Sequence, residues 1–177
     1  MTQRDESGRQ HPGPQPLTKS ERADRLKESI YLIFAALAVT LALRGHGDVE
    51  AGDALVTLAV TLAGTVLAVF TADVIAHVVV HGELMSRGEL VHAMRTSFGA
   101  LPAVALPFVL LGVSALTRWD VNAALLASAV ALAFALVALA WVAVRRVTLR
   151  WWERLVVLGI ETALAMAVIA LQLLAHA

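Results

Sequence analysis

The sequence predicts an all-α integral membrane protein, a bundle of five transmembrane helices with its N-terminus inside the cell and its C-terminus outside. Three observations predict this fold: an apolar composition, five long apolar runs, and an uneven distribution of Lys and Arg among the connections. Of the 177 residues, 59% are hydrophobic and only 16% are charged, and the mean hydropathy is +0.75. Soluble domains average about 45–50% apolar and about 25% charged residues. In water this chain would have too little polar surface to cover its apolar residues, whereas a bilayer solvates them.

The start of the chain differs in composition from the rest. Residues 1–20 are polar and rich in Pro, Gly and Gln. Such a segment cannot bury enough apolar surface to offset the entropy that it would lose on ordering. We therefore expect residues 1–25 to form a disordered cytoplasmic tail and residues 26–177 to form the transmembrane domain.

The five apolar runs predict helices at about 28–44, 54–80, 98–117, 121–144 and 153–175. A helix needs about 20 residues to cross the hydrocarbon core, and the first run is the shortest of the five. Pro102 and Pro107 predict an uneven start and a kink in the third helix. Because the runs are uniformly apolar and do not alternate, they exclude a β-barrel. Residues 83–95 fit either a short interfacial helix or an ordinary loop.

Positive charge gathers in the connections at one end of the predicted helices. Six Lys or Arg residues precede the first helix, two lie between the second and third, and four lie between the fourth and fifth. The connections at the other end hold only Arg44 and Arg118. Since loops rich in Lys and Arg stay in the cytoplasm, this asymmetry predicts a cytoplasmic N-terminus. The bias toward Ala, Val, Leu and Arg is typical of GC-rich bacterial genomes, so we expect a multi-pass protein of the bacterial inner membrane.

The composition also excludes classes of function. The net charge is zero, which argues against a nucleic-acid partner. The absence of cysteine excludes disulfides, thiolate nucleophiles and cysteine-based metal sites. No set of nucleophile, base and acid falls within one leaflet, and no glycine-rich phosphate loop is present. We therefore predict no enzymatic activity and no cofactor, with the lipid bilayer as a partner and a homo-oligomer left open.

Ionisable residues inside the apolar runs are the strongest indication of a site, because each costs roughly 2.5–3.5 kcal/mol at the membrane centre on insertion scales. With 1.5 Å per residue, Asp73 lies about 10 Å and Glu161 about 13 Å from the cytoplasmic ends of their helices. Glu28 and Tyr31 lie near the same level at the start of the first helix. The sequence thus predicts an inner-leaflet polar cluster of Glu28, Tyr31, Asp73, His77 and Glu161.

Two histidines extend this cluster along the second helix. Asp73, His77 and His81 recur every four residues, which places them on one helix face. Histidine side chains suit a proton relay, and His77 with His81 could also share a metal ion with an acid from another helix. The structural alternative is that Asp73 pairs with His77 to lower the cost of burying both. The spacing argues strongly against a zinc-protease site, because Val78 stands where the catalytic Glu would follow His77.

A stripe of hydroxyl groups lies in the outer half of the same helix. Thr57, Thr61 and Thr65 are again spaced by four residues, and they are candidate accessory groups on a polar path toward Asp73. Threonines in membrane helices more often bond back to the carbonyl four residues earlier, or join neighbouring helices. Both interpretations stay open.

The leading hypothesis from the sequence is a small channel or transporter that moves protons or a cation through the acid and histidine cluster. The competing hypothesis is a non-catalytic membrane scaffold or interaction protein that acts through its N-terminal tail. The third is a membrane-embedded metal-binding protein. Each hypothesis assigns a different role to the scarce polar residues.

Two short segments carry a resemblance to a known group of proteins. The first helix is entered through Glu28-Ser29-Ile30-Tyr31, and the second ends near Ala76-His77 before a short connection. In these features the chain resembles uncharacterised small multi-pass integral membrane proteins of actinobacteria, over about residues 25–175. The resemblance implies a membrane location and carries no activity.

Overall fold

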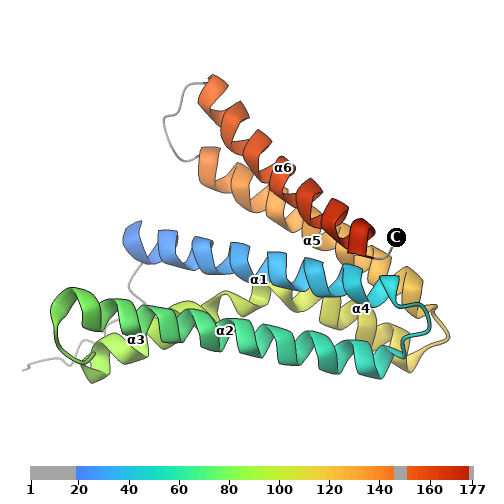
Figure 1. Ribbon diagram of the computed structural model, residues 1–177, viewed down its shortest axis with the longest axis horizontal. Helices are drawn as coiled ribbons and strands as arrows, with labels where there is room; N and C mark the ends of the chain where they lie inside the picture. Colours follow the sequence, from blue (N-terminus) through green and yellow to red (C-terminus); the bar gives the residue numbers. More distant parts are fainter. Residues whose placement is uncertain (1–18, 146–150, 176–177) are drawn as a thin grey trace, which may run out of the picture.

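The computed structural model describes residues 19–145 and 151–175 (Figure 1). Side chains at some positions inside these ranges, Glu161 among them, are outside the description. The described residues form helices and no strand: α1 (Lys19–Gly45), α2 (Ala51–His81), α3 (Arg87–Gly99), the 3-10 helix η1 (Leu101–Val104), α4 (Ala105–Leu116), α5 (Val121–Arg145) and α6 (Trp151–Ala175). The predicted all-α class is confirmed for this part of the chain.

Four of the described helical stretches are long and apolar enough to cross a membrane. They are Arg22–Gly45, Ala51–His81, the combined α3–η1–α4 stretch Arg87–Leu116, and Val121–Arg145. Large apolar side chains also cover much of the outer surface, such as Leu67 on α2 and Phe134 on α5. An apolar exterior of this kind suits contact with lipid rather than water. These features indicate a membrane-embedded protein, whereas the count of five spans and the orientation stay predictions.

The first helix begins earlier than the apolar pattern predicts. We expected residues 1–25 to belong to the tail, but α1 begins at Lys19, so residues 19–25 are helical. The reason is local, because Lys, Glu, Arg and Ala in this stretch are all good helix formers and can extend a helix beyond its apolar part. Residues 1–18, to which the rest of the tail prediction applies, are outside the described residues.

The third predicted span, 98–117, is broken near its start. Helix α3 ends at Gly99, and η1 follows with Pro102 in its first turn before α4 starts at Ala105. Proline lacks an amide N–H and its ring collides with the preceding turn, so Pro102 disfavours a continuous α-helix at this point. The predicted uneven start is therefore confirmed, and the helical stretch extends back to Arg87 rather than beginning at 98.

A capping box fixes the start of α3. The Ser86 hydroxyl accepts a hydrogen bond from the Glu89 amide at 3.4 Å, and the Glu89 carboxylate accepts one from the Ser86 amide at 2.8 Å. These reciprocal bonds satisfy two amide donors that a helix start otherwise leaves unpaired. The segment 83–95, which the sequence left open between a helix and a loop, is therefore mostly helical.

Helix α1 lies at the centre of the bundle. It packs against α2, α3, η1, α5 and α6, and in Figure 1 it runs between the α5–α6 hairpin and the α2–α4 side. Its buried residues include Leu32, Ile33, Ala36, Leu37 and Thr40, which form one helical stripe. A stripe that is buried against several neighbours makes α1 the core element.

Helix α2 contributes to the core along only part of its length. Its buried residues run from Ala51 to Val66, and no later residue of α2 is buried. The last turns of α2, up to His81, therefore leave the core and pack beside α3. This departure places the polar residues of α2 next to the start of α1 and the start of α3.

Candidate functional site

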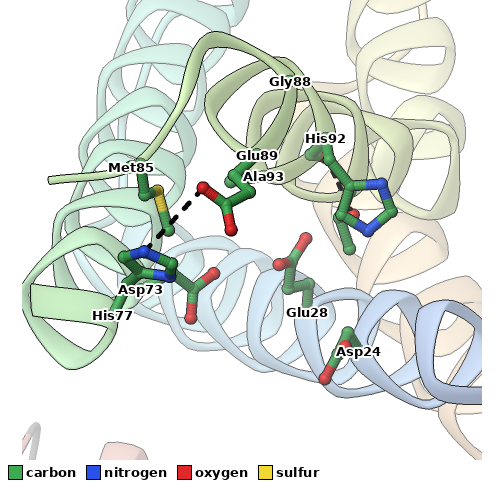
Figure 2. Close-up of a pocket in the computed structure, with 10 residues that line it drawn as sticks. Asp24, Glu28, Asp73, His77, Met85, Gly88, Glu89, His92 and Ala93 are labelled. Atoms are coloured by element: carbon green, nitrogen blue, oxygen red, sulfur yellow. Dashed lines mark hydrogen bonds and ion pairs between the residues drawn. The ribbon is translucent and has the colours of Figure 1, made fainter. Parts of the chain in front are cut away.

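A cavity of about 370 Å³ opens where α1 begins, α2 ends and α3 begins (Figure 2). Six ionisable side chains among the described residues line it: Asp24, Glu28, Asp73, His77, Glu89 and His92. Helix α1 supplies the first two, α2 the next two and α3 the last two. Three elements that are distant in the sequence thus bring four acids and two histidines together.

Glu28 is the most deeply buried of these acids. Its side chain lies on the core stripe of α1, one turn before Leu32, and only 2% of the residue is exposed. One carboxylate oxygen, Oε1, accepts a long hydrogen bond of 3.4 Å from the Ser97 hydroxyl on α3. Among the described residues, the other oxygen, Oε2, is buried without a hydrogen-bond partner. A buried carboxylate oxygen without a partner is costly, which makes Glu28 the most unusual group in the cavity.

A lysine at the start of α1 lies beside Asp73. The Lys27 Nζ atom lies 3.9 Å from the Asp73 Oδ1 atom, and the two side chains are 45% and 33% exposed. At this exposure the attraction is weakened by water, so the pair adds little to stability. Its consequence is electrostatic, because Lys27 offsets one of the negative charges around the cavity.

His77 links α2 to the capping box of α3. Its Nε2 atom lies 3.9 Å from the Glu89 Oε2 atom, and the two form an ion pair when the imidazole is protonated. The ring of His77 also stacks on that of His81, with centroids 4.3 Å apart and planes inclined by 23°. His81 itself is exposed and is not among the described residues that line the cavity. His77 and His81 therefore lie on one face of α2, as predicted, and His77 lines the cavity.

The structural alternative for α2 needs a correction. It paired Asp73 with His77, whereas the ion-pair partners in the structure are Lys27 for Asp73 and Glu89 for His77. Both partners come from other helices, and an i, i+4 pattern within α2 contains no information about them. The pairing therefore depends on how α1 and α3 pack against α2.

The carboxylates of Glu28, Asp73 and Glu89 point toward the same space between their helices (Figure 2). Like charges that face one another repel, and a cation between them removes that repulsion. No three His, Asp or Glu side chains within the described ranges are arranged to hold a metal ion directly. The arrangement can attract a proton or a cationic group, but it does not form a compact cage of ligands for a metal through His77 and His81.

The other predicted residues have different positions. Tyr31 is 50% exposed and is not among the described lining residues. Glu161 falls on α6, and its side chain is outside the described part of the chain. The Thr65 hydroxyl donates to the Thr61 carbonyl at 2.9 Å, as expected for the structural interpretation of that stripe. Thr57 is exposed, and the polar path along the three threonines stays a prediction.

Sequence reasoning did not identify Asp24, Glu89 and His92 as part of the site. Composition places Asp24 in the tail, and Glu89 and His92 lie in the segment 83–95, which fits either a helix or a loop. Two signals were available: Asp24 precedes Glu28 by one helical turn, and the Ser86-x-x-Glu89 spacing is typical of a capping box. Comparison of the chain with protein-family models, curated proteins and solved structures gave no match, so the cavity is interpreted from its own chemistry.

Proposed function

We propose that the protein is a transporter or channel of the bacterial inner membrane that moves protons or a small cation through the cavity between α1, α2 and α3. In this proposal α6 is the fifth transmembrane helix and the N-terminus is cytoplasmic. The start of α1 and helix α3, which lie at the cavity end, hold six of the described Lys and Arg residues, and segments rich in these residues stay in the cytoplasm. The cavity would then open to the cytoplasm.

The observation that carries the proposal is the buried Glu28 carboxylate. Removing a carboxylate from water costs several kcal/mol unless the group is paired, and the great majority of buried polar atoms in proteins have partners. Glu28 has a long bond to Ser97 and an unpartnered Oε2 atom. A proton or cation entering the cavity would supply the partner that the described residues do not provide.

The lining residues form a graded path to Glu28. Asp24 is exposed, Asp73 is partly exposed, and Glu28 is almost fully buried. A cation moving inward along these acids exchanges water for carboxylate oxygens step by step, which lowers the cost of removing its hydration shell. Beside this path His77 can take up or release a proton next to Glu89.

Behind Glu28 the packing is apolar. Leu32, Ile33 and Ala36 are at most 2% exposed along the same stripe of α1. A cation that leaves Glu28 toward the opposite end of the bundle has to displace this packing. We therefore favour a transporter that alternates between two packings over a permanently open pore.

The test is flux into liposomes that contain the purified protein, with a trapped pH dye for protons and radiolabelled Na⁺ for a cation. We expect flux above that of empty liposomes, and a loss of at least about tenfold in Glu28→Gln and Asp73→Asn, because each variant removes a charge that attracts the cation. Glu50→Gln is the matched control, since Glu50 is an exposed acid at the opposite end of α2.

Two results would contradict the proposal. One is the absence, in the wild-type protein reconstituted in a folded state, of flux of protons, of Na⁺ and of a small organic cation such as radiolabelled tetramethylammonium. The other is flux that Glu28→Gln and Asp73→Asn leave unchanged. Either result would favour the competing hypothesis of a membrane interaction protein.

A further inference from the structure

A second, apolar cavity lies beside the polar one. It has a volume of about 340 Å³ and lies between α2 and the α3–η1–α4 stretch. The buried residues Leu62 and Val66 line its inner side, and the exposed residues Leu67, Phe98 and Leu101 line its outer side. We call it the apolar groove. Its lining is almost entirely apolar, in contrast to the acids of the neighbouring cavity.

The apolar groove and the polar cavity follow each other along one face of α2. Val66 lines the groove and Asp73 lines the polar cavity. These positions are seven residues apart, which is about two helical turns, so they share a face and lie about 10 Å apart along the helix. Phe98, near the end of α3, also lines the groove. A molecule with its charge near Asp73 could therefore place an apolar part near Val66.

The size of the polar cavity also bears on the ligand. The cavity is open to its surroundings, and its volume of about 370 Å³ is large enough to admit the head of an organic cation. Such a cation would place its charge among Glu28, Asp73 and Glu89.

We propose that the substrate is an amphipathic organic cation, with its charged head in the polar cavity and its apolar part in the apolar groove. This inference rests on the proposed function and names the substrate class of the same site. It is carried by charge complementarity with the acids, by the unpartnered Oε2 atom of Glu28, and by the position of the groove along the same helices. Binding sites for small molecules commonly combine an apolar surface with a few polar groups that fix orientation.

The test compares two cations that share a head group. Protein in nanodiscs of zwitterionic lipid is dialysed against radiolabelled tetramethylammonium or hexyltrimethylammonium, and the uptake by empty nanodiscs is subtracted. We expect hexyltrimethylammonium to bind at least about tenfold more tightly, because each buried methylene group adds a few-fold in affinity. Uncharged hexan-1-ol should not displace it, since the acids recognise the charge.

Two alanines on α2 provide a matched pair of variants. Ala63 lines the apolar groove, whereas Ala68 is exposed on α2 and is not among the residues lining either cavity. Ala63→Phe should fill the groove and reduce the preference for the hexyl compound to less than about threefold, leaving the affinity for tetramethylammonium unchanged. Ala68→Phe should keep the full preference. Both positions are exposed, so neither variant inserts a large side chain into the core.

The wild-type comparison alone can overturn the inference, whatever the variants do. Equal affinity for the two cations would show that the groove does not take up the hexyl chain, and displacement by hexan-1-ol would show that the groove accepts an apolar chain without regard to charge. Proton or Na⁺ flux that depends on Asp73, without tighter binding of the hexyl compound, would refute the substrate class and leave the proposed function standing. The predicted binding without transport of any of these cations would refute the proposed function and leave the binding site standing.

Discussion

Replacing Glu28 with glutamine removes the charge of the buried carboxylate while keeping the size of the side chain and an oxygen that can accept from Ser97. The carboxylate is 2% exposed, and its Oε2 atom has no hydrogen-bond partner among the described residues. If Glu28 is present for function, the folded protein is less stable with the acid than with a neutral side chain of the same shape. The expected result is therefore a variant that is more stable and less active.

The magnitude follows from the burial of Glu28. Leaving a buried polar group unsatisfied costs about 1–3 kcal/mol, and a charged group costs more than a neutral amide. The amide of glutamine keeps part of this cost, because its nitrogen occupies the position of Oε2. We expect Glu28→Gln to raise the free energy of unfolding by about 1–2 kcal/mol. For a chain of this length each kcal/mol shifts the midpoint of thermal unfolding by about 2–4 °C.

The assay is thermal unfolding in detergent micelles, followed by far-ultraviolet circular dichroism. The control is Glu50→Gln at the exposed N-cap of α2, where the side chain makes no capping hydrogen bond. A surface change of that kind should stay within about 0.5 kcal/mol of the wild type. A loss of 1 kcal/mol or more in Glu28→Gln would refute the reasoning, because it would mean that the carboxylate has a favourable partner in the folded state.

Two further predictions concern the ends of the helices beside the cavity. Ser86→Ala should destabilise the protein by about 0.5–1 kcal/mol, because it removes the hydroxyl that caps α3, whereas Ser86→Thr should keep most of the stability. Gly82 ends α2 with a φ of 71°, a left-handed conformation that costs other residues roughly 1–2 kcal/mol. Gly82→Ala should therefore lower the free energy of unfolding by about that amount, and Gly82→Asn by less, since asparagine tolerates this conformation. Both are measured by thermal unfolding, and an unchanged midpoint in Ser86→Ala or in Gly82→Ala would contradict the corresponding assignment.

Much of the fold follows from patterns that are local in the sequence. Hydropathy located the long helices to within a few residues at most ends, and Pro102 located the break between α3 and α4. The start of α1 was missed because residues 19–25 are polar yet form a helix. Hydropathy indicates which residues contact lipid. Helix propensity and capping determine where the backbone hydrogen bonds of a helix begin and end.

The candidate site was only partly predictable. Helix direction and depth brought Glu28, Asp73 and His77 to one end of the bundle, and all three line the polar cavity. Tyr31 lies at a similar depth in the bundle, but its side chain is half exposed. The depth of a residue along a helix does not tell which side of the helix its side chain is on. Glu89 was absent from the prediction because its contribution depends on α3 folding back beside α2.

The sequence by itself determined the all-α class and the helical elements other than α3, because composition, apolar run length and proline position act within one segment of chain. Only the tertiary structure decided the partners of the polar groups. Lys27 lies beside Asp73 and Glu89 beside His77 because α1, α2 and α3 pack at one end of the bundle. Each of these contacts joins residues from different helices, and so it depends on rotation and packing angle rather than on spacing along the chain.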